Sequence, residues 1–127
     1  MTTQPAPTVD QILANMTVSL NGHIPPSVTY AATVMPQMVV RHVQDSGFAM
    51  PKDGTGALTE ETRTLIYLGV ALAAGSHACI EAMTNKAQAL GIEPAKLLET
   101  FKIARFAEAT RVLGNAEPLL AALDAQN

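Results

Sequence analysis

The only cysteine of the chain, Cys79, lies three residues beyond Ser76, which itself follows Gly75. A glycine followed by a polar cap residue ends one helix and begins another, so residues 59–91 are predicted to form two helices that meet at a tight corner. The start of a helix carries unpaired N–H groups and a partial positive charge, and both stabilise a thiolate. Cys79 is therefore a candidate reactive thiol that would attack a peroxide or form a mixed disulfide. The alternative is a buried cysteine that fills a small space in the core.

Histidines offer the other candidate chemistry. His77 is a candidate base for Cys79, although residues two apart on a helix point to different faces. His23 and His42 are expected at the surface or as capping residues. No pair among these three histidines and Cys79 has recognisable ligand spacing, so the sequence predicts no metal site and no cofactor.

The helix that leads to the corner determines the expected assembly. Thr59 is the expected N-cap, with Glu60 and Glu61 placed well for the helix dipole. From Leu65 to Ala74 the helix is apolar on nearly every side, which predicts burial on every side. One chain of this size can hardly cover such a helix, so we expect a homo-oligomer.

The rest of the chain is also expected to be helical. Residues 1–7 are predicted to be a flexible tail, and residues 8–127 a single domain. A helix is expected from Thr8 or Asp10 to Leu20, and further helices over residues 26–35, 36–44, 94–113 and 116–123. Glycines and prolines separate these helices, and a loop is expected at 46–58. The 94–113 helix is expected to bury Leu97, Leu98, Phe101, Ala104 and Ala107, with ion pairs 99–102, 105–108 and 108–111 on its other face.

Composition supports the all-α class and limits the partners. Apolar residues make up 48% of the chain, yet it has no Trp, two Tyr and three Phe, so the core must be built from aliphatic side chains that mostly favour helices. A formal charge of -3 argues against nucleic-acid binding. The 65–74 run is too short to span a membrane, and no signal peptide is visible. A single cysteine suits a reducing compartment, so a cytoplasmic location is expected.

Several segments, in order, resemble the alkylhydroperoxidase AhpD / carboxymuconolactone decarboxylase family. They are L-T-x-x-T-R-x-L-I-x-L-G from Leu58, C-I-E-A from Cys79, A-L-G from Ala89 and the tail from Phe101 to Leu120, preceded by Ile24-Pro25-Pro26. The similarity covers about residues 22–120. It implies an AhpD-like helical domain with a central buried helix hairpin, assembled as a trimer or a hexamer.

The family's C-x-x-C-x-x-x-H motif is degenerate in this chain. Cys79 matches the second motif cysteine, the thiol that meets the peroxide in AhpD-type enzymes, while Ser76 replaces the first cysteine and Met83 the histidine. Thr64 occupies the position of an expected carboxylate. A lone subunit therefore cannot form an internal disulfide, and nothing obvious relays a proton to Cys79. Ser76 suits a helix cap, and Met83 suits the core or an apolar pocket around Thr64, Cys79 and Met83 that would hold a small organic ligand.

Three classes of function follow. The first is a divergent AhpD-like thiol peroxidase that uses Cys79 alone with an external reductant. The second is a non-catalytic member that binds a small molecule or acts as a scaffold. The third is a decarboxylase or lyase acting on a small organic acid or lactone, for which the candidate cationic groups are Arg41, His42, Arg63 and His77.

Overall fold

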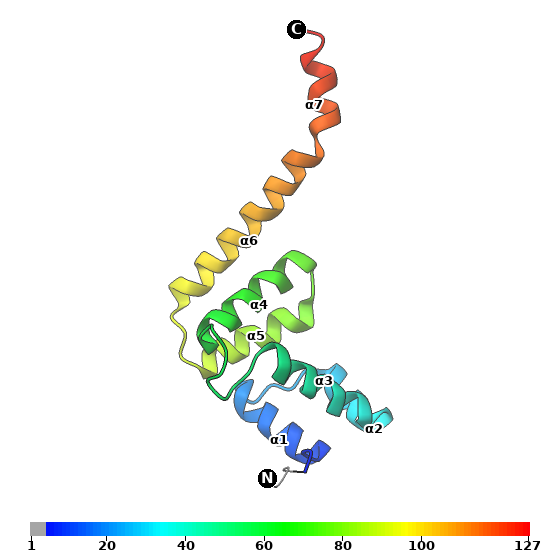
Figure 1. Ribbon diagram of the computed structural model, residues 1–127, viewed down its shortest axis with the longest axis vertical. Coiled ribbons are helices and arrows are strands. Elements are labelled where there is room, and N and C mark those ends of the chain that lie inside the picture. Colours follow the sequence, from blue (N-terminus) through cyan, green and yellow to red (C-terminus); the bar gives the residue numbers. More distant parts are fainter. Residues whose placement is uncertain (1–4) are drawn as a thin grey trace.

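The computed structural model describes residues 5–127, in which helices are the only regular secondary structure, and this confirms the all-α class (Figure 1). Residues 5–7 precede the first helix, while the rest of the predicted tail, 1–4, lies outside the described residues. The helices are α1 Val9–Ser19, α2 Pro26–Val34, α3 Pro36–Ala49, α4 Glu60–Ala74, α5 His77–Ala89, α6 Pro94–Asn115 and α7 Glu117–Asp124.

The antiparallel hairpin of α4 and α5 is the centre of the fold, and α6 packs along α4. Thr59 caps α4, because its hydroxyl accepts a hydrogen bond from the Thr62 N–H. The buried hydrophobic residues of this unit are small or aliphatic, as expected from a composition poor in aromatics: Leu68, Ala71, Ala82, Ala87, Ile92 and Ala104. Thr64 and Lys86 are the buried polar residues of the same unit. Alanines allow the helix axes to approach closely, so the hairpin is compact although its core is thin.

Helices α1, α2 and α3 form a second group, which contacts the hairpin through α1 and α5. Thr8 begins α1 with a reciprocal capping box that involves Gln11. Pro26 begins α2 and Pro36 begins α3, both at positions where a missing N–H costs nothing. These starts agree with the starts predicted from the sequence.

The end of α3 was predicted wrongly. The helix continues five residues beyond Gln44 to Ala49, and the Met50 N–H still donates to the Ser46 carbonyl at 2.7 Å. Gly47 lies inside the helix, where glycine costs only about 1 kcal/mol relative to alanine. Pro51 follows Met50 and disfavours further helix. The connecting loop is therefore shorter than the predicted 46–58.

Helix α6 also differs from the prediction. It runs through Gly114 to Asn115, and of its predicted apolar face only Ala104 is buried, while Leu98 and Phe101 are exposed. Among the described residues, only the Glu108–Arg111 member of the three predicted ion pairs forms, at 2.8 Å. Beyond its first turns α6 leaves the body of the molecule, and α7 extends it further (Figure 1).

The central helix α4 is not covered on every side by its own chain. Ile66 and Val70, both on α4, remain 51% and 62% exposed. The hairpin is central, as predicted, but it is only partly buried within one chain. No helix in residues 5–127 combines the length and apolarity that crossing a bilayer requires.

Candidate functional site

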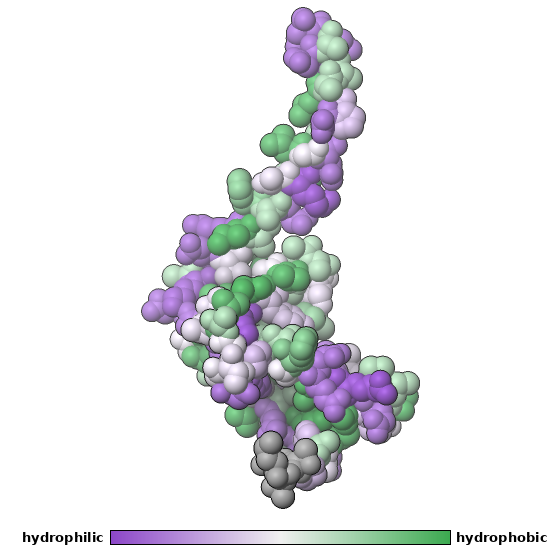
Figure 2. All heavy atoms as spheres, in the orientation of Figure 1, coloured by the Kyte–Doolittle hydropathy of each residue, from purple (hydrophilic) through white to green (hydrophobic). Residues whose placement is uncertain are grey.

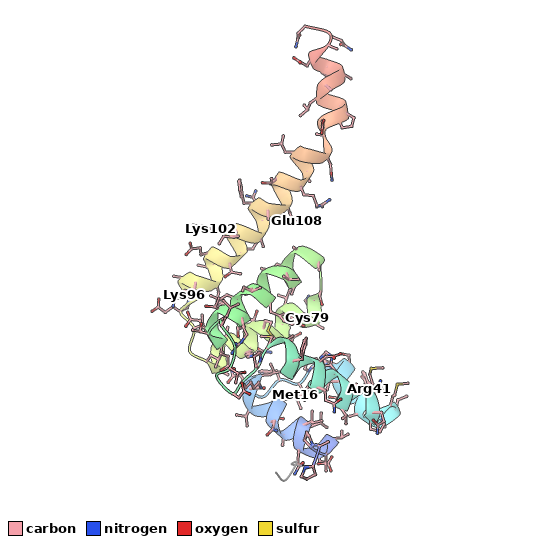
Figure 3. The ribbon with its side chains drawn as sticks, in the orientation of Figure 1. Met16, Arg41, Cys79, Lys96, Lys102 and Glu108 are labelled. Carbon is pink, nitrogen blue, oxygen red and sulfur yellow. The ribbon has the colours of Figure 1, made fainter. Side chains whose placement is uncertain are left out.

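The corner between α4 and α5 positions Cys79. Gly75 adopts a φ of 73°, in the left-handed region that glycine tolerates best. The N–H of Ser76, the next residue, donates a hydrogen bond to the Ala71 carbonyl at 3.0 Å. The chain then enters α5 at His77, so Cys79 lies in the first turn of that helix (Figure 3). The sequence predicted this corner and the position of Ser76 at the start of α5, but the Ser76 side chain does not cap that helix.

Two hydroxyl groups act on the sulfur of Cys79. The phenol oxygen of Tyr67, on α4, lies 3.3 Å from the Cys79 Sγ. The Ser76 side chain makes no capping hydrogen bond to α5, so its hydroxyl is free to interact with the thiol instead. The pKa of the Cys79 thiol is lowered, first by the Ser76 hydroxyl and second by the Tyr67 hydroxyl. Partial burial of the thiol acts in the opposite direction and raises its pKa. The contact between Tyr67 and Cys79, together with burial, raises the pKa of Tyr67. A hydroxyl that stays protonated beside a thiol that ionises is suited to donate a hydrogen bond to a thiolate.

Cys79 lines an open cavity of about 370 Å³. Its polar side chains are Arg63 towards the start of α4 and Tyr67, Ser76 and Cys79 around the corner. The other lining residues are apolar and come from the end of α3, the following loop and α4: Ala49, Met50, Leu58, Ile66, Val70, Ala71 and Ala74. This volume is at the lower end of the range for small-molecule sites, and such a lining suits a small ligand that is mostly hydrocarbon.

The structure brings only part of the predicted site together. Ser76 and Cys79 both line the cavity, whereas His77 is exposed and lies outside it. Thr64 is fully buried, with its hydroxyl donating to the Glu60 carbonyl at 2.8 Å. Met83 is half-buried, and neither it nor Thr64 lines the cavity. Cys79 therefore lines a cavity that includes neither Thr64 nor Met83, and the pocket predicted around these three residues stays a prediction.

Sequence reasoning missed Tyr67 as a site residue. It is the only aromatic residue between 59 and 91, in a helix that is otherwise aliphatic, and that contrast was the available signal. Of the four cationic candidates, only Arg63 lines the cavity; its guanidinium donates to the Leu58 carbonyl at 2.7 Å. Within residues 5–127 no group of three or more potential ligands is arranged to hold a metal ion.

Residues 40–122, more than half of the chain, match the model of the carboxymuconolactone decarboxylase family. The match begins in α3, includes the whole hairpin and ends within α7. It confirms the family similarity expected from the sequence. No curated protein matches the chain.

Proposed function

Because the chain belongs to the carboxymuconolactone decarboxylase family, we propose that it is a divergent AhpD-like member in which Cys79 alone reduces a small organic hydroperoxide. The observation that carries this proposal is the Tyr67–Cys79 contact of 3.3 Å on the wall of an apolar cavity. A thiol with a lowered pKa is a better source of thiolate, and thiolate is the nucleophile in peroxide reduction.

The proposed step is a two-electron transfer. The Cys79 thiolate attacks the terminal oxygen of the hydroperoxide, so that an S–O bond forms as the O–O bond breaks. The sulfur is oxidised to a sulfenic acid, and the peroxide is reduced to an alkoxide that takes a proton from the Tyr67 hydroxyl. Solvent then returns the proton to Tyr67.

An external low-molecular-weight thiol is needed to complete the cycle, because the chain has no second cysteine. That thiol displaces water from the sulfenic acid and forms a mixed disulfide with Cys79. A second molecule of the thiol then releases Cys79 and leaves as the reagent disulfide. A reducing cytoplasm supplies such thiols, and we place the protein there on this ground.

The test combines sulfenic acid trapping with peroxide consumption. With cumene hydroperoxide and dithiothreitol, we expect the wild-type protein to consume peroxide and to form a dimedone adduct at Cys79. Cys79→Ser removes both signals, and Tyr67→Phe slows consumption, by about tenfold or more if the hydroxyl serves as the acid. His23→Gln, at an exposed site in the α1–α2 connection, is the matched control. His77→Gln tests the base predicted from the sequence, whose side chain lies outside the cavity.

A folded protein with neither dimedone adduct nor peroxide consumption would support the second candidate, a non-catalytic small-molecule binder. The apolar lining of the cavity favours that function. The fluorescent probe N-phenyl-1-naphthylamine would then bind the wild-type protein. It would not bind Ala74→Phe, because the new side chain starts from an exposed position at the cavity and fills it.

A lyase acting on a small organic acid has one supporting observation, the guanidinium of Arg63 at the cavity. Arg63 already donates to a backbone carbonyl, so only its remaining N–H groups are free to hold a carboxylate. If the Arg63→Gln variant lost turnover of a carboxylate substrate but still consumed peroxide at the wild-type rate, the result would favour the lyase over the peroxidase.

We also propose that the protein works as a homo-oligomer, a trimer or a hexamer as the resemblance implied. The exposed apolar side chains of Ile66 and Val70 on the central helix support an assembly in which α4 lies near the subunit interface. Light scattering at micromolar concentration tests this, and a stable monomer would contradict it.

A further inference from the structure

The chain exposes far more surface than a compact protein of its size. Its accessible surface is 9376 Å² for a mass of 13.4 kDa. A compact monomer of that mass exposes about 6,500 Å², so the excess is roughly 2,900 Å². One partner in an obligate homodimer contributes about 1,000–2,500 Å² to the interface. The excess is thus as large as the share that one chain gives to an extensive permanent interface.

Residues 108–124, the second part of α6 together with α7, include no buried residue, and we term them the arm. Among the helices, α7 contacts mainly α6, and the arm projects from the body (Figure 1; Glu108 is labelled in Figure 3). Its exposed apolar side chains are Val112, Leu113, Leu119, Leu120 and Leu123. Figure 2 shows hydrophobic residues, in green, along this projection. A helix of eight residues, such as α7, is not stable in water without packing, so the arm needs a partner surface.

A complementary surface exists on α4. Ile66 and Val70 form a ridge that lines the Cys79 cavity on one side and, on the other, an apolar groove of about 520 Å³ between α4 and α6. The ridge therefore joins two hollows into one continuous apolar surface. Helix α4 has 15 residues and is about 22 Å long, and the arm, at about 25 Å, is long enough to cover it from end to end.

We propose that the arm of a second copy of this chain packs along the Ile66–Val70 ridge and closes the Cys79 cavity. The occupant is a second copy because α6 is an unbroken helix of 22 residues that carries its own arm away from its own α4. The importance of the closure rests on the proposed role of Cys79, whereas the docking itself does not. A closed cavity excludes bulky reagents from the thiol, and the site is incomplete in a single chain.

Photo-cross-linking tests where the arm docks. Chains that carry benzoylphenylalanine in place of Leu120 are assembled with ¹⁵N-labelled wild-type chains and irradiated. We expect cross-links between labelled and unlabelled chains that map to the tryptic peptide 64–86, which contains the ridge and Cys79. The same probe in place of Asp10, on the exposed side of α1, serves as the matched control and should not label that peptide. Cross-links within one chain, or to another peptide, would overturn the proposal.

Thiol accessibility tests the closure. The double variant Leu119→Asp/Leu120→Asp should be a folded monomer whose Cys79 reacts with Ellman's reagent about tenfold faster than in the wild-type assembly, because docking limits access to the cavity. The control, Leu119→Met/Leu120→Met, keeps the apolar surface and should keep both assembly and rate. A monomeric wild-type protein, or a variant that dissociates with no change in rate, would contradict the proposal. Neither measurement depends on peroxide turnover, so the docking can fail while the proposed activity stands, and the reverse.

Discussion

At the scale of single residues, the side chains that affect the Cys79 thiol are the hydroxyl groups of Tyr67 and Ser76. Ser76 and Tyr67 stabilise the Cys79 thiolate once it exists, but neither group accepts the thiol proton near neutral pH. The proton must therefore leave to solvent, and the fraction of reactive sulfur follows the thiol's own pKa. The chemistry of this site should depend on pH more simply than that of a site with a histidine base.

The pH dependence of alkylation measures this directly. The rate of Cys79 modification by iodoacetamide should rise with a midpoint below 9.0, the ordinary value for the thiol. Ser76→Ala should raise the midpoint more than Tyr67→Phe, because the Ser76 hydroxyl is the larger cause of the shift. Since the folded state favours the thiolate, the stability it gains is present above the ordinary pKa and lost as pH falls through the lowered pKa. A midpoint at or above 9.0 would show that the hydroxyls have no effect on the thiol.

Ser76 offers a second residue-scale prediction. Both Ser76 and Cys79 line the same cavity, three residues apart, so Ser76→Cys places two thiols on one wall. Under mild oxidant the variant should lose both thiols to an internal disulfide within a monomeric mass, as judged by thiol titration and mass spectrometry. Thr84→Cys, one turn beyond Ile80 on α5, is a control that should keep both thiols. A folded Ser76→Cys protein that retains both thiols would mean that the two sulfurs cannot meet.

At the scale of elements, the corner at Gly75 orients α5 and its cysteine. An alanine Cβ would meet nothing within 4 Å there, so the backbone conformation alone sets the preference for glycine. Gly47 offers a contrast, because it too has open space around it but lies within α3 without a positive φ. Because neither site is crowded, the two glycines differ only in backbone conformation, and their substitution measures the effect of that conformation alone.

Substitution by alanine should thus have opposite effects at the two positions. Gly75→Ala should lower the free energy of unfolding by about 1–2 kcal/mol, the cost of a left-handed residue with a side chain. Gly47→Ala should raise it by about 0.5–1 kcal/mol through helix propensity. Urea denaturation of the three proteins at equal concentration gives both values. Equal effects of the same sign would contradict the assigned backbone conformations.

Features that depend on neighbouring residues could be predicted from the sequence, whereas contacts between helices could not. The corner and the start of α4 were predictable because Gly75 and Thr59 act on their immediate neighbours. The end of α3 was not, since the small cost of one glycine is easily offset by continuing the helix to the next proline. The Tyr67–Cys79 contact joins residues 12 apart on different helices and depends on how α4 is rotated against α5. No local pattern encodes that rotation.

At the scale of the whole molecule, the chain has two unequal parts. The hairpin and α1–α3 have buried residues of their own, whereas the arm has none between Glu108 and Asp124. An exposed apolar arm and an exposed apolar ridge in one chain mean that the folded subunit should be most stable when assembled.

Concentration should therefore change thermal stability. The melting temperature of the wild-type protein should rise across about a hundredfold increase in concentration, because mass action favours the assembled form. Leu119→Asp/Leu120→Asp should melt at a lower temperature that does not depend on concentration. Differential scanning calorimetry at several concentrations measures both. A wild-type melting temperature independent of concentration would indicate that association does not contribute to folding.

If chains assemble through the arm as proposed, its attachment at one end should also affect the lifetime of a newly made chain. Before assembly, the backbone amides of residues 108–124 lie in a helix without tertiary support, so they should exchange hydrogen rapidly and be open to proteases. The arm carries a trypsin site at Arg111. Cleavage there removes α7 and leaves the hairpin intact, so an unpartnered subunit would lose its means of association before it lost its fold.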